Sequence, residues 1–183
     1  MGIINKAYAA HPRLVCIVGT KSGEKTNFMT AAWHTYLSHS PAMYGVAVGN
    51  NRFTNDLIRE AGEFTVSFLS IEHILKVHSL GKLTGRIYNK IDLIDLNVEP
   101  GNQVTVPYLP EAYAVLECKL VNQVPTGDHT LFVGEIVDCH GNDEVFDKDG
   151  VIYTDKARPV MYLGKNNYIT TDQDSEKHFA MDE

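Results

Sequence analysis

The sequence predicts a mainly β (α+β) fold, an antiparallel β-barrel with a few covering helices. Segments of strand character outnumber helical segments, and most neighbours along the chain are joined by short turns, as in hairpins. The 183 residues contain no internal repeat and no low-complexity linker. We therefore expect one domain over residues 1–183.

The first 50 residues are expected to contribute three strands. Residues 13–20 (RLVCIVGT) are apolar and rich in β-branched side chains, and a Lys-Ser-Gly turn follows them. Residues 26–36 are again apolar and small, so the two segments predict a hairpin. Residues 41–49 predict a third strand, because a proline and an Asn-Asn pair bound this apolar run.

Residues 52–61 change to a helical period. Leu57, Ile58 and Ala61 would share one face of a helix. Thr54 lies three residues before the first apolar position, where an N-cap is expected.

The middle of the chain predicts one strand, one short helix and an irregular stretch. Residues 63–70 alternate as a strand does, and residues 72–80 form a short helix that is expected to end at Gly81. The pattern is weak from there to about residue 100. Long irregular stretches in compact domains are usually functional or part of an interface.

The strongest strand pair is expected at residues 112–124 and 130–140. In the first of these segments Val115, Glu117 and Lys119 would share one face of the strand. A five-residue turn, PTGDH, joins the two segments.

The C-terminal part of the chain carries weaker signals. Residues 142–155 are rich in turn-forming side chains, and residues 159–163 predict a last strand. Residues 170–183 form a polar, acidic tail that is expected to pack loosely.

Charge argues against polyanionic partners. The chain has 16 Lys and Arg against 23 Asp and Glu, a net charge of −7. Nucleic acids and anionic membrane surfaces attract basic proteins, so neither is expected as a partner. Any anion that this protein binds must be held by a local group of donors.

The cysteines and the hydropathy indicate a cytoplasmic protein. Cys16, Cys118 and Cys139 lie far apart in apolar runs without a CxxC motif, which is typical of buried cysteines in a reducing compartment, although a redox thiol remains an alternative. No apolar run approaches the ~18 residues of a spanning helix, and the N-terminus lacks the pattern of a signal peptide.

Several catalytic signatures are absent from the sequence. It contains no GxGxxG after a strand, no GxSxG elbow and no HExxH. None of the eight histidines has a partner at helical metal-ligand spacing, so no metal is expected.

Two polar segments in the first third of the chain could bind a flat, anionic ligand. Residues 27–33 (NFMTAAW) combine an amide, small side chains and the only Trp, so that a planar ring could lie against the backbone. Residues 50–54 (NNRFT) precede the expected helix, whose N-terminus, with an arginine and a hydroxyl, suits a phosphate. A buried strand and an ordinary capped helix are the plain alternatives.

Two further segments add charge. Residues 80–91 hold cations, glycines and a Thr in an irregular stretch, which is either an anion site or a solvated loop. Residues 127–130 (GDHT) place a His beside an Asp at a hairpin tip, where it could orient a proton donor or simply lie on the surface.

These segments, in this order, resemble the flavin reductase-like family with the FMN-binding split barrel, and especially its flavoredoxin branch. The resemblance covers about residues 12–168. It is carried by NFMTAAW after a VxIVGT-type strand, by NRFTNDLI leading to GEFTVSFLS, by GxxTGRxxNK, and by LEC followed by GDHTLFVGEIV.

The resemblance implies a non-covalent FMN in a groove at a homodimer interface. The implied cofactor contacts are Asn27, Met29, Thr30, Ala31, Trp33, Arg52, Thr54, Lys90, His129 and Tyr162. Thr54 and Arg52 are assigned to the phosphate, and Trp33 and Tyr162 to aromatic walls.

The remaining contacts concern the polar edge of the ring. Asn27 and the backbone of residues 29–31 would bond the heteroatoms of the isoalloxazine. Lys90 could serve the phosphate or the N1–C2 edge, and His129 the ring or the ribityl chain. No catalytic acid or base is assigned.

The implied function is an oxidoreductase that passes hydride or electrons through FMN. NADH or NADPH is a candidate donor, but many relatives have Cys before the glycine loop where this chain has His78-Ser-Leu-Gly, and no pyridine-nucleotide pocket is evident. The alternatives are an NAD(P)H-independent electron carrier with a redox protein partner, a pyridoxamine-phosphate-oxidase type of enzyme, and a non-enzymatic split-barrel ligand-binding module.

Overall fold

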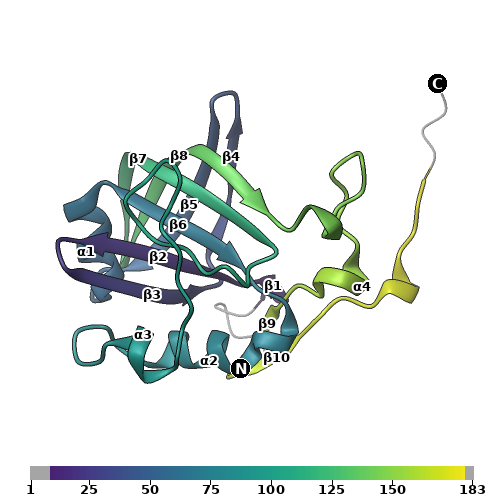
Figure 1. Ribbon diagram of the computed structural model, residues 1–183, viewed down its shortest axis with the longest axis horizontal. Coiled ribbons are helices and arrows are strands. Elements are labelled where there is room, and N and C mark those ends of the chain that lie inside the picture. Colours follow the sequence, from purple (N-terminus) through teal and green to yellow (C-terminus); the bar gives the residue numbers. More distant parts are fainter. Residues whose placement is uncertain (1–8, 180–183) are drawn as a thin grey trace.

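Ten strands dominate the computed structural model, which describes residues 9–179 (Figure 1). Seven form one antiparallel sheet in the order β3-β2-β6-β7-β8-β5-β4. They are β2 (Cys16–Ser22), β3 (Lys25–Ala31), β4 (His34–His39), β5 (Ala42–Gly49), β6 (Glu63–Phe68), β7 (Ala114–Thr126) and β8 (His129–Gly141). The mainly β, antiparallel fold class is thereby confirmed.

A small second sheet and short helices complete the chain. The order of the second sheet is β1-β9-β10. Its strands are β1 (Arg13–Leu14), β9 (Met161–Gly164) and β10 (Asn167–Ile169). The α-helices are α1 (Phe53–Ala61), α2 (Ile74–Lys82), α3 (Lys90–Leu93) and α4 (Thr154–Ala157). The 3₁₀ turns are η1 (Ile71–His73), η2 (Asp143–Val145) and η3 (Gln173–Ser175).

The large sheet closes on itself at one end only. Its outer strands β3 and β4 are consecutive in the chain and are linked by Ala32 and Trp33, and the Ala47 N–H of β5 donates to the Trp33 carbonyl at 2.8 Å. Within residues 9–179, β3 and β5 are not neighbours in the sheet. The barrel is therefore split between β3, an outer strand, and the end of β5, where Ala47 to Gly49 extend past the pairing of β5 with β4.

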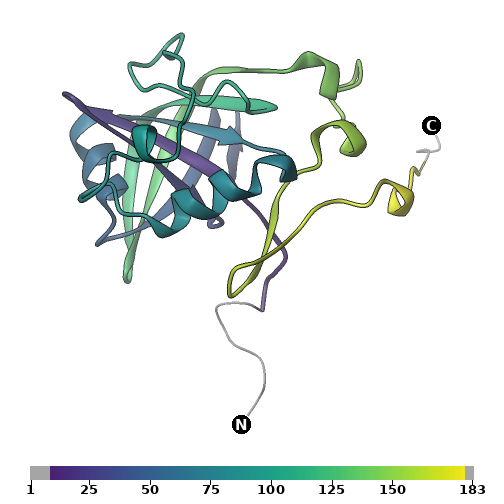
Figure 2. The ribbon, with the colours of Figure 1, turned by 60° about the horizontal axis from the view of Figure 1, so that its bottom comes forward.

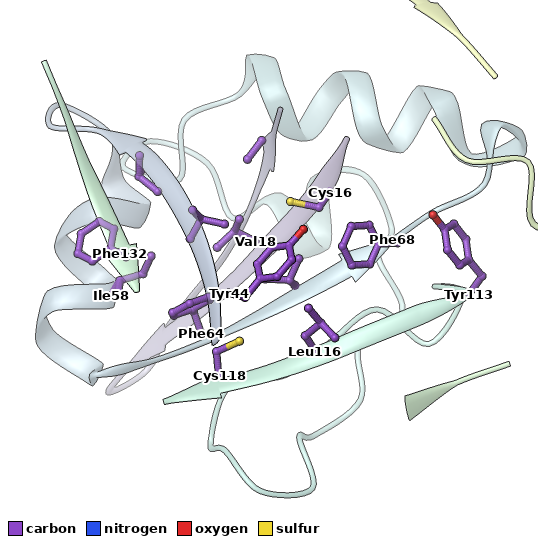
Figure 3. Packing of buried hydrophobic residues seen from close by; sticks show 14 of the residues in the cluster. Cys16, Val18, Tyr44, Ile58, Phe64, Phe68, Tyr113, Leu116, Cys118 and Phe132 are labelled. Carbon is purple, nitrogen blue, oxygen red and sulfur yellow. The ribbon is translucent and has the colours of Figure 1, made fainter. Parts of the chain in front are cut away.

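The wall of the barrel is buried on both faces at β2. Along this strand Cys16 and Val18 point into the barrel, while Ile17 and the preceding Val15 belong to a second apolar cluster beneath α2. Inside the barrel the rings of larger side chains converge (Figure 3). They include Tyr44, Phe64, Phe68 and Phe132. A wall covered on both sides explains why residues 13–20 are a continuous apolar run.

Two helices cover the barrel near the split. Ile58 of α1 is fully buried in the barrel cluster, and Val77 and Leu80 of α2 pack in the outer cluster beside β3. Figure 2 shows α2 lying across this outer side, while the C-terminal segment extends away from the barrel. None of the helices that the structure describes is long and apolar enough to cross a bilayer.

Three expectations about the helices and the second strand were wrong in detail. The single strand over residues 26–36 breaks at Ala32, whose carbonyl leaves the ladder and accepts a bond from Arg13 Nε at 2.8 Å. Arg52, not Thr54, is the N-cap of α1. Helix α2 continues through Gly81 to Lys82, because packing against β3 outweighs the low helix propensity of glycine.

The C-terminal half shows three further differences. The β7–β8 ladder extends to the Thr126–His129 pair, so the connection is a tight turn at Gly127 and Asp128 instead of five residues. Strand β10 was not expected. Cys139 is exposed, whereas Cys16 and Cys118 are buried as predicted. The expected loose tail is described to residue 179, and residues 180–183 lie outside the described part.

Candidate functional site

Two adjoining pockets lie at the split of the barrel. The wide pocket has a volume of about 420 Å³ and the narrow pocket about 70 Å³. They share Met29 of β3, Arg52 before α1 and Gly81 of α2. A broad chamber that narrows into a small polar recess is the shape required by a planar ring carrying a charged tail.

Small side chains and two neighbouring aromatic rings form one side of the wide pocket. Ala31 of β3 and Ala47 and Gly49 of β5 line the floor along both edges of the split. The rings of Trp33 and His129 lie 4.6 Å apart between centroids with a 32° tilt. Because β3 is an outer strand, its backbone groups on this side are free of strand partners and can bond a ligand.

Aromatic residues of the small sheet and of α2 form the opposite side. The ring centroids of Tyr162 and Tyr168 lie 5.2 Å apart, and the Tyr168 hydroxyl is 3.3 Å from His78 Nδ1. Burial raises the pKa of Tyr168, so its hydroxyl stays protonated and can donate a hydrogen bond. His11 also lines this side, edge-on to Tyr162.

The narrow pocket is built at the start of α1. Thr54 is buried in the first turn, and its Oγ1 accepts a hydrogen bond of 2.9 Å from Asn27 Nδ2. The other amide atom, Asn27 Oδ1, is buried without a hydrogen-bond partner among residues 9–179. Arg52 is the N-cap of α1, but within the described chain its side chain makes no capping hydrogen bond. The recess thus contains polar groups whose hydrogen bonding is incomplete.

Lys90 brings a buried cation to the same recess. Its Nζ donates to the carbonyls of Phe28 at 2.8 Å and Leu80 at 3.1 Å, which joins β3 to the end of α2. Burial first, and then the positive charge of Arg52, lower the pKa of Lys90 to about 8. A ligand phosphate would relieve this repulsion between the two cations.

Gly85 leaves room at the edge of the narrow pocket. A Cβ at this position would lie 2.2 Å from Asn27 Oδ1 and 2.9 Å from Cδ1 of Phe53. The glycine therefore allows the loop after α2 to approach Asn27 and the helix start closely. Any larger residue would fill the recess.

The charge of the two pockets opposes that of the whole protein. Among residues 9–179, no Asp or Glu lines either pocket, although the chain carries seven more negative than positive charges. The cations Arg52, Lys82 and Lys90 do line them. These cations form the local positive group that an acidic protein would need in order to hold an anion.

All ten residues predicted as cofactor contacts line these two pockets. The wide pocket contains Met29, Thr30, Ala31, Trp33, Arg52, His129 and Tyr162, and the narrow pocket contains Asn27, Thr54 and Lys90 together with Met29 and Arg52. The structure brings them together, while their contacts with a cofactor stay a prediction.

Other lining residues were not among the predicted cofactor contacts. They include His11, His78, Lys82, Thr84, Gly85 and Tyr168. The glycines and cations of residues 80–91 were a usable signal for three of them. Tyr168 lies on β10, a strand that was not expected, so no local pattern indicated it.

A second polar cluster, the Glu117 cluster, lies outside these pockets. Glu117, Asp138 and His140 place their ligand atoms within 4.8 Å of one another, an arrangement that the histidine spacing did not predict. Glu117 is fully buried and accepts backbone N–H bonds from Asn102, Gln103 and Val104 at 2.7 to 3.1 Å. These N–H groups bond to both carboxylate oxygens, so the hydrogen bonds of Glu117 hold residues 102–104 against β7.

The chain is similar to known proteins over most of its length. A family model described as flavin reductase like domain matches residues 8–166. A ferric-chelate reductase (NAD(P)H) of Archaeoglobus fulgidus is 30% identical over 136 residues, which are 74% of this chain and 76% of that protein.

Solved structures share the fold along nearly the whole chain. An FMN-binding protein from Thermus thermophilus with bound cyclohex-2-enone is 31% identical, with a TM-score of 0.85 and coverage of 99% of this chain and 97% of that one. The flavoredoxin of Desulfovibrio vulgaris (Miyazaki F) is 27% identical, with a TM-score of 0.86 and coverage of 98% and 97%. The fold is that of split-barrel flavin reductases, as the sequence motifs predicted.

Proposed function

The chain belongs to the flavin reductase-like family, and from this premise we propose that it binds FMN non-covalently in the two joined pockets and works as an oxidoreductase. One observation carries the proposal: within the part of the chain that the structure describes, a recess with two cations, no carboxylate and an amide oxygen without a partner opens into a flat-walled chamber. FMN has the matching parts, a dianionic phosphate and a planar tricyclic ring. The similar FMN-binding protein and flavoredoxin support the same choice.

The narrow pocket fits the phosphate end. Arg52 supplies a guanidinium, the start of α1 supplies backbone N–H groups, and Thr54 supplies a hydroxyl. Lys90 adds a second positive charge to the recess. Asn27 Oδ1, which lacks a partner in the described chain, is placed to accept a bond from a hydroxyl of the ribityl chain.

The wide pocket fits the ring. Ala31, Ala47 and Gly49 leave a flat floor, and the exposed backbone edge of β3 can bond the heteroatoms. Trp33 and Tyr162 cover the ring from the two sides of the chamber and limit the access of water. When bound, FMN supplies the hydride and electron chemistry, and the protein supplies position and electrostatics.

The electron donor divides the proposal into two versions. The ferric-chelate reductase relative supports an enzyme that takes hydride from NADH or NADPH. The flavoredoxin relative supports an electron carrier that is reduced by a redox protein partner. We favour the pyridine-nucleotide enzyme as the first version to test, and no residue is assigned as a catalytic acid or base.

Absorption spectroscopy tests the function directly. The purified protein, or the protein after addition of FMN, should absorb at about 450 nm with a spectrum shifted from that of free flavin. Anaerobic mixing with NADH or NADPH should bleach this band. Bleaching only by a reduced redox protein would identify a carrier, and a colourless protein that leaves added FMN unbound would contradict the proposal.

We also propose that two copies of the chain form the complete groove in the cytoplasm. The Trp33 side chain is 43% exposed at the mouth of the wide pocket, and Tyr36 of the adjacent strand is 65% exposed. A second copy would bury these aromatic surfaces and shield the flavin. Light scattering should give twice the chain mass, and Tyr36→Glu should lower both the mass and the FMN affinity. A monomer that binds FMN with full affinity would contradict the dimer alone.

A further inference from the structure

The two sides of the wide pocket belong to different sheets. Ala31 of β3 and Trp33 after it lie on the side of the large sheet, whereas Tyr162 lies on β9 of the small sheet. A planar ring between these sides needs a fixed spacing, because a gap at either face removes van der Waals contact. The links between the two sheets therefore decide how well the chamber fits a ring.

Two side-chain hydrogen bonds join the small sheet to the residues on either side of Trp33. Arg13 Nε donates to the carbonyl of Ala32, the residue before Trp33, at 2.8 Å. Nε2 of His34, the residue after Trp33, lies 2.9 Å from the Leu14 carbonyl. Arg13 and Leu14 are the two residues of β1. Strand β1 thus holds the chain both before and after Trp33.

The same strand is paired with the opposite side of the pocket. In the antiparallel ladder of β1 and β9, Arg13 is the direct partner of Tyr162, and Leu14 is the partner of Met161 (Figure 1). Strand pairing fixes such partners relative to each other. One arginine therefore links the wall that carries Tyr162 to the peptide that carries Trp33.

Hydrogen bonds around Trp33 do more than burial to fix the direction of its ring. The side chain is 43% exposed, so packing alone holds it weakly. Its carbonyl accepts a bond of 2.8 Å from the Ala47 N–H, the Ala32 carbonyl is bonded to Arg13, and His34 is bonded to β1. Three successive residues are thereby held in place.

The partners of His34 define the role of each ring nitrogen. A carbonyl can only accept, so Nε2 carries a proton and donates to Leu14. Burial lowers the pKa of His34, so the ring is neutral at neutral pH. Nδ1 therefore accepts from the Tyr44 hydroxyl, which lies 2.6 Å away.

We propose that Arg13 and His34 are positioning residues for the flavin ring, because they tie β1 to both neighbours of Trp33 and so hold the Trp33 and Tyr162 walls at a fixed spacing. The inference rests on the proposed function, since the wide pocket must hold the ring. Neither Arg13 nor His34 lines the wide or the narrow pocket, so both act through the walls. Their effect falls on the ring and not on the phosphate.

Titration with riboflavin and with FMN tests this role, because riboflavin has the ring and the ribityl chain but no phosphate. Arg13→Leu and His34→Phe should each weaken both ligands by the same factor, about fivefold, and shift the visible band of the bound flavin. Arg52→Ala with Thr54→Ala should weaken FMN far more than riboflavin. Arg13→Gln should restore affinity and band, since the glutamine Nε2 takes the place of the arginine Nε as donor.

Trp33 reports on the same role without a cofactor, because it is the only tryptophan of the chain. Its fluorescence anisotropy should fall in cofactor-free Arg13→Leu and His34→Phe, since the ring moves more freely. His39→Phe is the matched control, which removes an exposed imidazole from the same strand and should leave the anisotropy and both affinities unchanged. Circular dichroism checks that each variant is folded. If one of the two fails to fold, the other tests the role from its own side of Trp33.

The outcomes separate this inference from the function beneath it. If folded variants bind both flavins as tightly as the parent protein does, or if the anisotropy of Trp33 is unchanged, the positioning role is wrong and the proposed function stands. A loss of affinity for FMN alone would also overturn the role, because it would place the effect at the phosphate. If the parent protein binds neither flavin, the proposed function and the positioning role both fail.

Discussion

The Glu117 cluster and the narrow pocket are both polar sites that are buried against the barrel wall. They differ in their hydrogen bonds, which are complete in the first site and incomplete in the second. In the first, both oxygens of a buried carboxylate accept backbone N–H groups, and His140 adds a bond of 3.0 Å to Oε1. In the second, Asn27 Oδ1 accepts nothing within the described chain and two cations repel each other.

This difference separates structural polar groups from binding groups. A buried group whose bonds are complete contributes to stability and offers nothing to a ligand. A buried group with incomplete bonds costs stability until a ligand supplies the missing partner. We therefore expect substitutions in the Glu117 cluster to change unfolding, and substitutions in the narrow pocket to change FMN binding.

The largest effect is expected for Glu117→Ala. The substitution leaves three backbone donors buried without an acceptor, which should lower the free energy of unfolding by about 3–5 kcal/mol. FMN affinity of the folded protein should not change. Urea denaturation measures the first quantity and flavin titration the second. Glu135→Ala is the control, since this carboxylate lies exposed on β8.

The acid side of the stability profile should depend on the same carboxylate. Burial alone would raise the pKa of Glu117, but the N–H groups of residues 102–104 and His140 outweigh it, so its pKa lies below the usual value. A folded-state pKa below the unfolded one gives stability that is present at neutral pH and lost as pH falls through the folded pKa. In Glu117→Gln the free energy of unfolding should fall less steeply as the pH is lowered. An unchanged fall would show that other carboxylates cause it.

The next largest effect is expected for Arg52→Ala combined with Thr54→Ala. Loss of the charge-assisted contacts to the phosphate should weaken FMN binding by about 2–4 kcal/mol. The cofactor-free protein should lose much less stability than Glu117→Ala does. Lys21→Ala removes an exposed cation of β2 away from both pockets and should leave FMN affinity unchanged. Equal affinity of the double variant and the parent protein would place the phosphate elsewhere.

A smaller effect is expected from pH through Lys90. Its pKa of about 8 should rise when the phosphate binds, so FMN affinity should be constant between about pH 7, where the phosphate is dianionic, and pH 8, and should fall above pH 8 by about tenfold. The free energy of unfolding of the cofactor-free protein should instead rise as the pH increases above 8, because Lys90 keeps its proton to higher pH in the unfolded state than in the folded state. Lys90→Met should remove both slopes. If FMN affinity still falls above pH 8 in this variant, another titratable group causes the pH dependence.

The smallest effect on affinity is expected for Trp33→Leu. The ring lies at the mouth of the wide pocket and its loss should cost about 1 kcal/mol of FMN binding. The absorption band of the bound flavin should shift, because its aromatic neighbour is removed. A band that stays identical in the variant would show that Trp33 does not touch the ring.

Local patterns predicted the parts of the fold that depend on neighbours in sequence. The β7–β8 pair, strand β5 and helix α1 follow from alternation, from bounding turns and from a helical period. The ten pocket-lining residues came from ordered family motifs, which record how distant segments meet. Composition alone could not have placed Asn27 beside Thr54.

Features that depend on long-range packing were missed for physical reasons. Glu117 shares a strand face with Val115, and only the crossing of residues 102–104 buries it. The β9–β10 hairpin turns at Lys165 and Asn166, both with positive φ, without the Asn-Gly signal that usually marks such a turn. The break between β3 and β4 depends on the Arg13 bond to Ala32.

A crystal structure of the protein grown with FMN tests the central claim most directly. The phosphate should lie in the narrow pocket within hydrogen-bond distance of Arg52 and Thr54, and Glu117 should keep its three backbone bonds unchanged. A phosphate bound outside this recess, with Asn27 Oδ1 still unpartnered, would contradict the account.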